Sequence, residues 1–179
     1  MYKIGDNIVA VSTNIQSSSL NIIRCSGPSV FTLYKRLTKK TKNPKPNSAF
    51  PHVLYSGTNE KIIDQAVVVC FGEPKSFTGE NMVEFTVHGG RAIAEALIES
   101  LLSFNCRLAE PGEFSYRAFV NGKIDLIQAE AINELVLSES SIAVDYSMKN
   151  LLGALSKQIN IVFKSLKKTI TIMEHELDF

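Results

Sequence analysis

The stretch MVEFTVHGG at residues 82–90 decides the fold that we expect. Apolar and polar residues alternate along it, which is the two-residue period of a strand with one buried face. Its polar side includes Glu84 and His88, which therefore share one face of the strand. The residues expected to face inward are Val83, Phe85 and Val87. The closing glycine pair precedes residues 92–104, whose apolar side chains recur at helical spacing, so we expect a strand, a glycine turn and a helix in succession.

Strands and helices alternate on both sides of this stretch. Short runs rich in β-branched or apolar residues indicate further strands, at residues 7–11, 20–25, 62–71 and 106–108. Helical spacing indicates two more helices, at residues 29–37 and 113–120. The second of these helices ends at Asn121 and Gly122, where glycine accepts the left-handed conformation. The first 120 residues therefore predict an α+β domain with a mixed sheet.

A lysine-rich segment at residues 39–47 interrupts this pattern. It contains four lysines and two prolines. We interpret it as a solvated linker, because a nucleic-acid surface normally interleaves aromatic with basic residues and this segment has no aromatic residue. The alternative that it contacts a phosphate backbone stays open.

The last third of the chain is expected to be all-helical, since from residue 125 onward it has one glycine and no proline. Asp125 and Gln128 have the spacing of a capping box at the start of a helix over 126–137, and residues 138–141 indicate a break. Beyond the break, apolar residues recur at intervals of three and four and predict one long coiled-coil-like helix of about 50 Å. These residues are Met148, Leu152, Leu155, Ile159, Val162, Leu166, Ile170, Met173 and Leu177. Such a helix needs a partner, and because no capping signal precedes the chain end, we expect the missing part of a longer protein to supply it.

Composition excludes several classes of protein. The length of 179 residues suits one compact domain with an appendage, and a net charge of +1 gives no global field that attracts nucleic acid or a membrane. The three cysteines, Cys25, Cys70 and Cys106, are widely spaced and odd in number, so we expect buried, inert thiols in a reducing compartment. No run of eighteen apolar residues and no secretion signal is found. We expect a cytoplasmic protein without a membrane span.

Three short blocks mix glycine turns with charged residues. They are SFTGE at 76–80, EFTVHGG at 84–90, and AEPGEF at 109–114 followed by NGKIDL at 121–126. Charges and special backbone positions stand where a purely structural segment is normally apolar or variable. The blocks therefore indicate a binding site.

Together with IIRCSGP at residues 22–28, these blocks resemble the N-terminal region of the MnmE (TrmE) family of tRNA-modification GTPases, over essentially the whole chain. The resemblance implies a tetrahydrofolate-binding and dimerisation domain at residues 1–121, with an aminomethyltransferase-like fold. It implies the first helices of a central helical domain at residues 122–179. The sequence has no GxxxxGK[ST] phosphate loop. The family's GTPase domain, with its GTP, Mg²⁺ and K⁺, is therefore expected outside this chain, which alone should not hydrolyse GTP.

The resemblance also implies a reaction and a site. Full-length members act as homodimers with a flavin-dependent MnmG-type partner and build an aminomethyl-type group on C5 of the tRNA wobble uridine. The carbon comes from a 5-formyl or 5,10-methylene tetrahydrofolate. By motif position, the folate-binding residues are Arg24, Glu84 and Lys123. A carboxylate such as Glu84 can accept the paired N–H donors of a pterin, and the two cations suit the anionic glutamate tail of the ligand. No catalytic residue is assigned.

Each candidate residue also has a simpler explanation. Glu84 could be an exposed acid or half of a salt bridge, Arg24 could form a cross-strand ion pair, and Lys123 could be a charge flanking a helix. His88 could act as a general base or could only shape the turn that follows it. No metal site is expected, because the three histidines lack ligand spacing; they are His52, His88 and His175.

Two other functions stay open. The chain could be a stand-alone folate-dependent aminomethyltransferase, or a dimerisation module with a decayed pocket. The second alternative rests on residues 12–19, a loop without glycine where relatives often have glycine and proline. Asn81 also replaces the acid that usually follows the Gly-Glu pair.

Overall fold

The computed structural model describes residues 5–14, 18–57 and 61–177. The chain divides into two compact units, Met1–Lys123 and Ile124–Phe179. The sequence places this boundary between residues 121 and 122, close to the structural division. The functions assigned to the two parts stay predictions.

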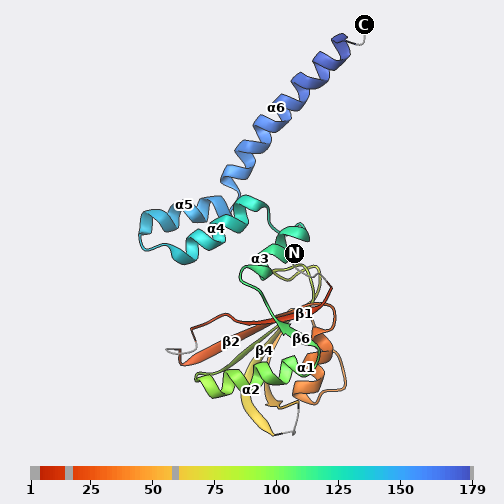
Figure 1. The fold of residues 1–179 in the computed structure, drawn as a ribbon, viewed down its shortest axis with the longest axis vertical. Coiled ribbons are helices and arrows are strands. Elements are labelled where there is room, and N and C mark those ends of the chain that lie inside the picture. The colour runs from red at the N-terminus through yellow and green to blue at the C-terminus, as the bar shows by residue number, and fades with distance from the viewer. Residues whose placement is uncertain (1–4, 15–17, 58–60, 178–179) are drawn as a thin grey trace. The chain divides into compact units, whose positions relative to one another are not determined.

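The first unit is built on a six-stranded sheet with the order β3-β4-β5-β2-β1-β6 (Figure 1). The β1–β6 pair is parallel and the other pairs are antiparallel, so the predicted mixed sheet of an α+β domain is confirmed. The strands are β1 (Asn7–Val11), β2 (Leu20–Ser26), β3 (Ser48–Tyr55), β4 (Ile62–Phe71), β5 (Met82–His88) and β6 (Cys106–Leu108). The helices of this unit are α1 (Val30–Thr38), α2 (Arg91–Leu102) and α3 (Glu113–Val120).

The hydrophobic core lies between one face of this sheet and helices α1 and α2 (Figure 1). The three inward-facing residues predicted for β5 are fully buried, and they pack with Leu37 of α1 and Leu97 of α2. Because side chains alternate along a strand, Glu84 lies on the opposite face of the sheet, away from these helices. The alternation of β5 thus fixes both the core and the face that carries the candidate site.

Strand β3 is not predicted from the sequence. It contains Pro51, which cannot donate a backbone hydrogen bond to a ladder, and its pattern of exposed and partly buried residues is irregular. β3 is an edge strand that pairs only with β4, which is where proline is tolerated in a sheet.

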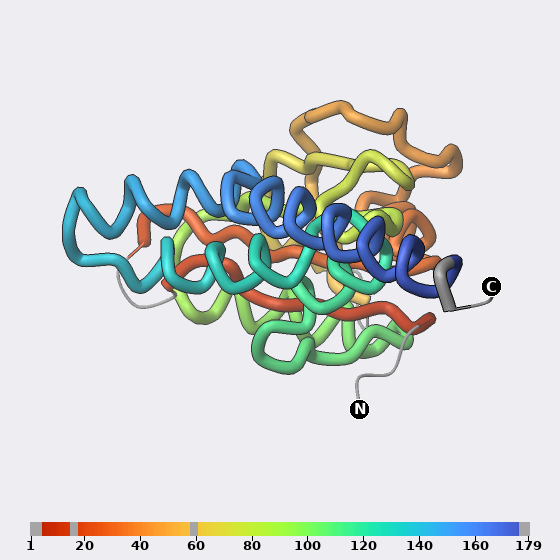
Figure 2. The backbone as a smooth tube through the Cα atoms, turned by 90° about the horizontal axis from the view of Figure 1, so that it is seen from above, coloured from red at the N-terminus to blue at the C-terminus, as the bar shows by residue number. Residues whose placement is uncertain are grey.

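The second unit consists of helices α4 (Leu126–Leu137), α5 (Ser141–Leu151) and α6 (Ala154–Leu177). The predicted capping box is present: the Asp125 side chain accepts from the Gln128 amide, and the Gln128 side chain accepts from the Asp125 amide. Helices α4 and α5 pack side by side (Figure 2). Within the described residues, no helix is both long and apolar enough to span a membrane.

The prediction of one long helix from Met148 onward is wrong. Gly153 has a φ of +84°, a left-handed conformation that ends the preceding helical segment. Met148 therefore belongs to α5, Leu152 lies in the turn, and the long helix begins at Ala154. At 1.5 Å per residue, the 24 residues of α6 span about 36 Å, shorter than the expected 50 Å.

Candidate functional site

Arg24 and Glu84 lie directly opposite each other on the antiparallel pair β2–β5. The Arg24 Nε donates to the Glu84 Oε1 at 2.7 Å. The cross-strand ion pair considered for both residues is therefore present. Their side chains are 31% and 19% exposed, so solvent reaches both charges and a ligand can approach them.

Two aromatic rings accompany the Arg24 guanidinium. Its Cζ lies 5.7 Å from the ring centroid of Phe77 and 5.7 Å from that of Phe114. Such distances are within the range of a cation–π contact. Both phenylalanines lie inside the sequence motifs, at positions to which no role is assigned from the sequence. The structure combines a carboxylate, a guanidinium and two aromatic faces at one place on the sheet.

The loop between β4 and β5, residues 72–81, connects this pair to the third predicted residue. Lys123 Nζ donates to the Pro74 carbonyl oxygen at 2.9 Å, and Asn121 Nδ2 donates to the Thr78 carbonyl oxygen at 2.7 Å. A Cβ added to Gly79 would lie 3.1 Å from the Lys123 side chain, so the loop and this lysine are closely packed. Lys123 therefore lies against the loop that carries Phe77, with no described contact to the Arg24–Glu84 pair.

A buried ionic network holds the β4–β5 loop through Glu80. Arg117 on α3 is 1% exposed and pairs with three carboxylates, at 2.6 Å to Asp6, 3.1 Å to Glu80 and 3.1 Å to Glu113. Arg107 on β6 completes the network, at 2.8 Å to Asp6 and 2.6 Å to Glu113. We call these five residues the Arg117 cluster. It joins β6, the start of β1, the β4–β5 loop and α3.

The electrostatics of the Arg117 cluster favour ionised acids. Burial opposes ionisation of Asp6 and Glu113, but hydrogen bonds from Arg107 and Arg117 outweigh it and lower the pKa of both carboxyls. Ser26 also donates to Glu80 at 2.7 Å. Every acid of the cluster thus has a hydrogen-bond donor, which a buried charge requires.

His88 forms hydrogen bonds of the kind expected for a turn-shaping residue. Its Nδ1 lies 2.8 Å from Asp64 Oδ1, and its backbone amide donates to Asp64 Oδ2 at 2.7 Å. Burial opposes ionisation of Asp64, yet the His88 donors lower the pKa of its carboxyl. Directly after His88, a Cβ on Gly89 would lie 2.1 Å from the Ser18 carbonyl oxygen, so the backbone approaches closely there and glycine is required.

The expectation of buried thiols is confirmed. All three cysteines are buried, and burial raises the pKa of Cys25 and raises that of Cys70 to about 12. In the part of the chain that the structure describes, no group of three or more histidine, cysteine, aspartate or glutamate side chains is placed so that it could hold a metal ion.

Comparison with known proteins identifies the first unit. Residues 7–123 match the family model for the N-terminus of the GTP-binding protein TrmE. The chain belongs to this family. The Arg24–Glu84 pair, the β4–β5 loop and Lys123 all lie within the matched residues, so the candidate site is part of the TrmE N-terminal domain.

Curated relatives named tRNA modification GTPase MnmE match nearly the whole chain. The Buchnera aphidicola protein (subsp. Cinara cedri) is 42% identical over 178 residues, covering 99% of this chain and 38% of its own length. The proteins of Chlorobium phaeobacteroides and Aquifex aeolicus are each 39% identical, over 97% and 96% of this chain and 38% of their own length. The TrmE-family chain therefore spans less than two fifths of the length of these relatives.

We expect Arg117→Ala to lower the free energy of unfolding by about 3–5 kcal/mol, because it leaves three carboxylates without their shared cation. Urea denaturation at pH 7 measures the change. Arg91→Ala is the matched control, since Arg91 also pairs with a glutamate four residues away but is largely exposed; it should change stability little. Equal effects of the two substitutions would contradict the role given to the cluster.

Acidification should weaken the same network. The ordinary pKa values of Asp6 and Glu113 are 3.8 and 4.5, and folding lowers both. Their stabilising contribution is therefore complete above about pH 5 and is lost as the pH falls through the lower folded-state values. We expect the stability difference between wild type and Arg117→Ala to shrink between pH 5 and pH 3 in urea denaturation. If this stability difference stayed constant over the pH range, the Arg117 cluster would not be its origin.

Proposed function

We propose that the TrmE N-terminal domain of this chain binds a tetrahydrofolate one-carbon donor at the Arg24–Glu84 pair. The observation that carries the proposal is a carboxylate next to a guanidinium that lies 5.7 Å from two aromatic rings. A pterin is flat, aromatic and rich in N–H donors on one edge. Phe77 and Phe114 offer faces on which such a ring can stack, and Glu84 offers an acceptor for its donors.

The Arg24–Glu84 ion pair leaves Glu84 able to accept hydrogen bonds from a pterin. The described hydrogen bond from Arg24 reaches only Oε1 of Glu84, whereas a carboxylate has two oxygens that each accept more than one bond. A pterin edge can therefore bind Glu84 while Arg24 stays close. Alternatively, it can displace Arg24 from Glu84, and the Arg24 guanidinium can then pair with the carboxylates of the ligand's tail. Lys123, on the far side of the β4–β5 loop, is a second cation for the tail carboxylates.

We also propose that the first unit has the aminomethyltransferase-like fold of folate-binding domains and forms a homodimer. Two exposed apolar residues share the open face of the sheet with the site: Leu20 is 51% exposed, and Val67 is 47% exposed. In register they lie opposite His88 and Thr86, so they stand on the same face as Glu84. A second copy that covered this face would bury them.

We propose an activity for the whole protein from the names of its relatives. Because they are named tRNA modification GTPases, we propose that the longer protein modifies C5 of the tRNA wobble uridine, with a flavin-dependent MnmG-type partner. GTP, Mg²⁺ and K⁺ would bind in a GTPase domain beyond these residues. The glycine-free loop at 12–19 lies partly outside the described residues, so the argument for a decayed pocket stays open.

We expect calorimetric titration of the 179-residue chain with 5-formyltetrahydrofolate to show saturable binding, and Glu84→Gln to weaken it at least tenfold. The substitution keeps the size of the side chain, removes its charge and replaces one acceptor oxygen by an NH2 donor. Glu95→Gln, on the exposed surface of α2, should bind as the wild type does. If Glu84→Gln bound normally, the pterin anchor would be wrong. If folded wild-type chain bound nothing, the dimerisation module would be the better function.

A further inference from the structure

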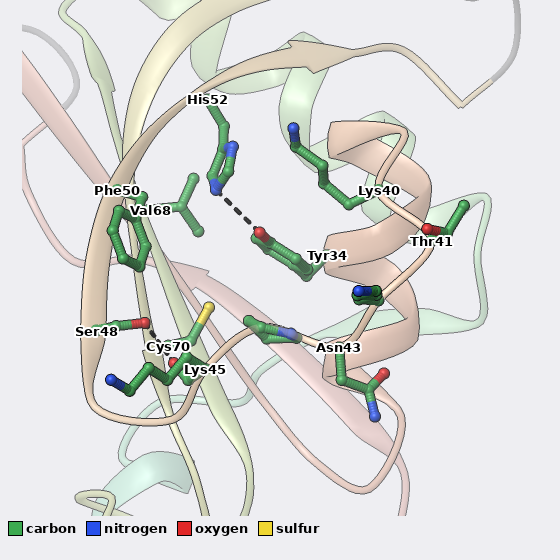
Figure 3. A pocket seen from close by; sticks show the side chains of 12 residues that line it. Tyr34, Lys40, Thr41, Asn43, Lys45, Ser48, Phe50, His52, Val68 and Cys70 are labelled. Atoms are coloured by element: carbon green, nitrogen blue, oxygen red, sulfur yellow. Dashed lines mark hydrogen bonds between the residues drawn. The ribbon is translucent and has the colours of Figure 1, made fainter.

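A cavity of about 260 Å³ lies at the other edge of the sheet, between α1, β3 and the lysine segment 39–47 (Figure 3). Its floor includes Val68 and Cys70 of β4. These residues alternate with Val69, which lies opposite Glu84 in register. The cavity is therefore on the helix-covered face of the sheet, and the Arg24–Glu84 pair is on the opposite face. The two sites are separate.

The rim of this cavity is positively charged. Lys40, Lys42 and Lys45 line it and are exposed, and no carboxylate is among its lining residues. The described residues contain no ion pair for any of these three lysines. Burial, and then the nearby charge of Lys40, lower the pKa of His52, so its imidazole is neutral at pH 7. A cavity with three cations and no anion favours a ligand that carries several negative charges.

The same cavity contains aromatic rings. Tyr34 and His52 face each other inside it (Figure 3), with the Tyr34 hydroxyl 2.9 Å from His52 Nε2 and the rings edge to face at 5.4 Å. Phe50 lines the β3 side and is 52% exposed, although it points to the face that otherwise forms the core. Three lysines line the same cavity, and the exposed Phe50 offers a face on which a flat ring can stack.

This arrangement favours the alternative left open for the lysine segment, that it contacts a phosphate backbone. The segment was assigned to a solvated linker because no aromatic residue is interleaved with its lysines. The fold supplies those aromatic residues from two other elements, α1 and the unpredicted strand β3. Basic and aromatic side chains are thus interleaved in space, which is the combination that single-stranded nucleic acid requires.

We propose that this cavity binds a single-stranded nucleic-acid segment, with one base on Phe50 and adjacent phosphates on Lys40, Lys42 and Lys45. The volume suits about one nucleotide. A membrane surface would favour protruding rather than recessed apolar groups, and an acidic peptide would not need the aromatic face. We choose RNA as the ligand because the proposed function is tRNA modification, and the choice of RNA rests on that proposed function.

Fluorescence anisotropy tests the proposal, with the 179-residue chain and a labelled single-stranded 12-nucleotide RNA. We expect the double substitution Lys42→Glu with Lys45→Glu to weaken binding at least tenfold, and Phe50→Ala to weaken it about fivefold or more. Lys167→Glu with Lys168→Glu, on α6, makes the same change in net charge and should stay within twofold of wild type. With three phosphate contacts, log K should fall with log salt concentration at a slope of about −2.

Several results would overturn the proposal. Equal losses of RNA affinity in the cavity and α6 double variants would show that only net charge matters. Normal RNA binding by Phe50→Ala would show that no base stacks on Phe50. Stronger binding to a duplex of the same sequence, or binding to phosphatidylserine vesicles instead of RNA, would assign the cavity to another partner. Tighter binding of a single-stranded DNA 12-mer of the same base sequence than of the RNA would exclude RNA as the ligand. Circular dichroism of each variant must match wild type.

The folate titration separates this proposal from the proposed function. If RNA binding fails while 5-formyltetrahydrofolate still binds, only the nucleic-acid site is wrong. If RNA binds through the cavity while folate does not bind, only the folate site is wrong. The cavity variants should retain folate binding, because they lie on the other face of the sheet.

Discussion

Arg117 is the residue on which the arrangement of the first unit depends. A guanidinium that is 1% exposed is costly unless each of its donors is matched, and Asp6, Glu80 and Glu113 provide the acceptors. These acids come from the segment before β1, the β4–β5 loop and α3. A single buried cation therefore fixes three segments that have no regular ladder between them.

The candidate site follows from that constraint. Phe114 is adjacent to Glu113 at the start of α3, and Phe77 lies three residues before Glu80 in the loop. When the Arg117 cluster fixes Glu113 and Glu80, it also sets where these two rings stand beside Arg24. The ladder between β2 and β5 places Arg24 opposite Glu84 independently. The site is thus the meeting point of a sheet register and a buried ionic network.

The sequence predicted the parts of this structure whose causes are local. Strand β5, the glycine turn after it and the Asp125–Gln128 capping box depend on neighbouring residues, and they appear as expected. Strand β3 was missed because Pro51 is unfavourable in a strand except at an edge, and strand order is not visible locally. The break at Gly153 was missed because one glycine competes weakly with a continuous apolar seam.

The candidate site shows the same limit. Its three predicted residues came from motif position, whereas Arg117 and the two phenylalanines were given no role. Arg117 contacts Asp6 across 111 positions and Glu80 across 37, so no local pattern reveals the network. The aromatic residues that line a cavity together with the lysine segment belong to other elements, so the pattern of that segment alone could not reveal them. A local sequence pattern could not predict contacts that single charged or aromatic residues make with residues far away in the chain.

The central claim is that a folate ring binds Glu84 between Phe77 and Phe114 beside Arg24, and NMR tests it most directly. Arginine Nε–H signals, assigned with Arg24→Lys, and phenylalanine ring protons are followed as 5-formyltetrahydrofolate is added. The account predicts that the Arg24 signal shifts at saturation, that both rings show nuclear Overhauser effects to the pterin, and that the Arg117 signal stays in place. Saturable binding without a shift of Arg24, or with pterin contacts to other residues, would contradict it.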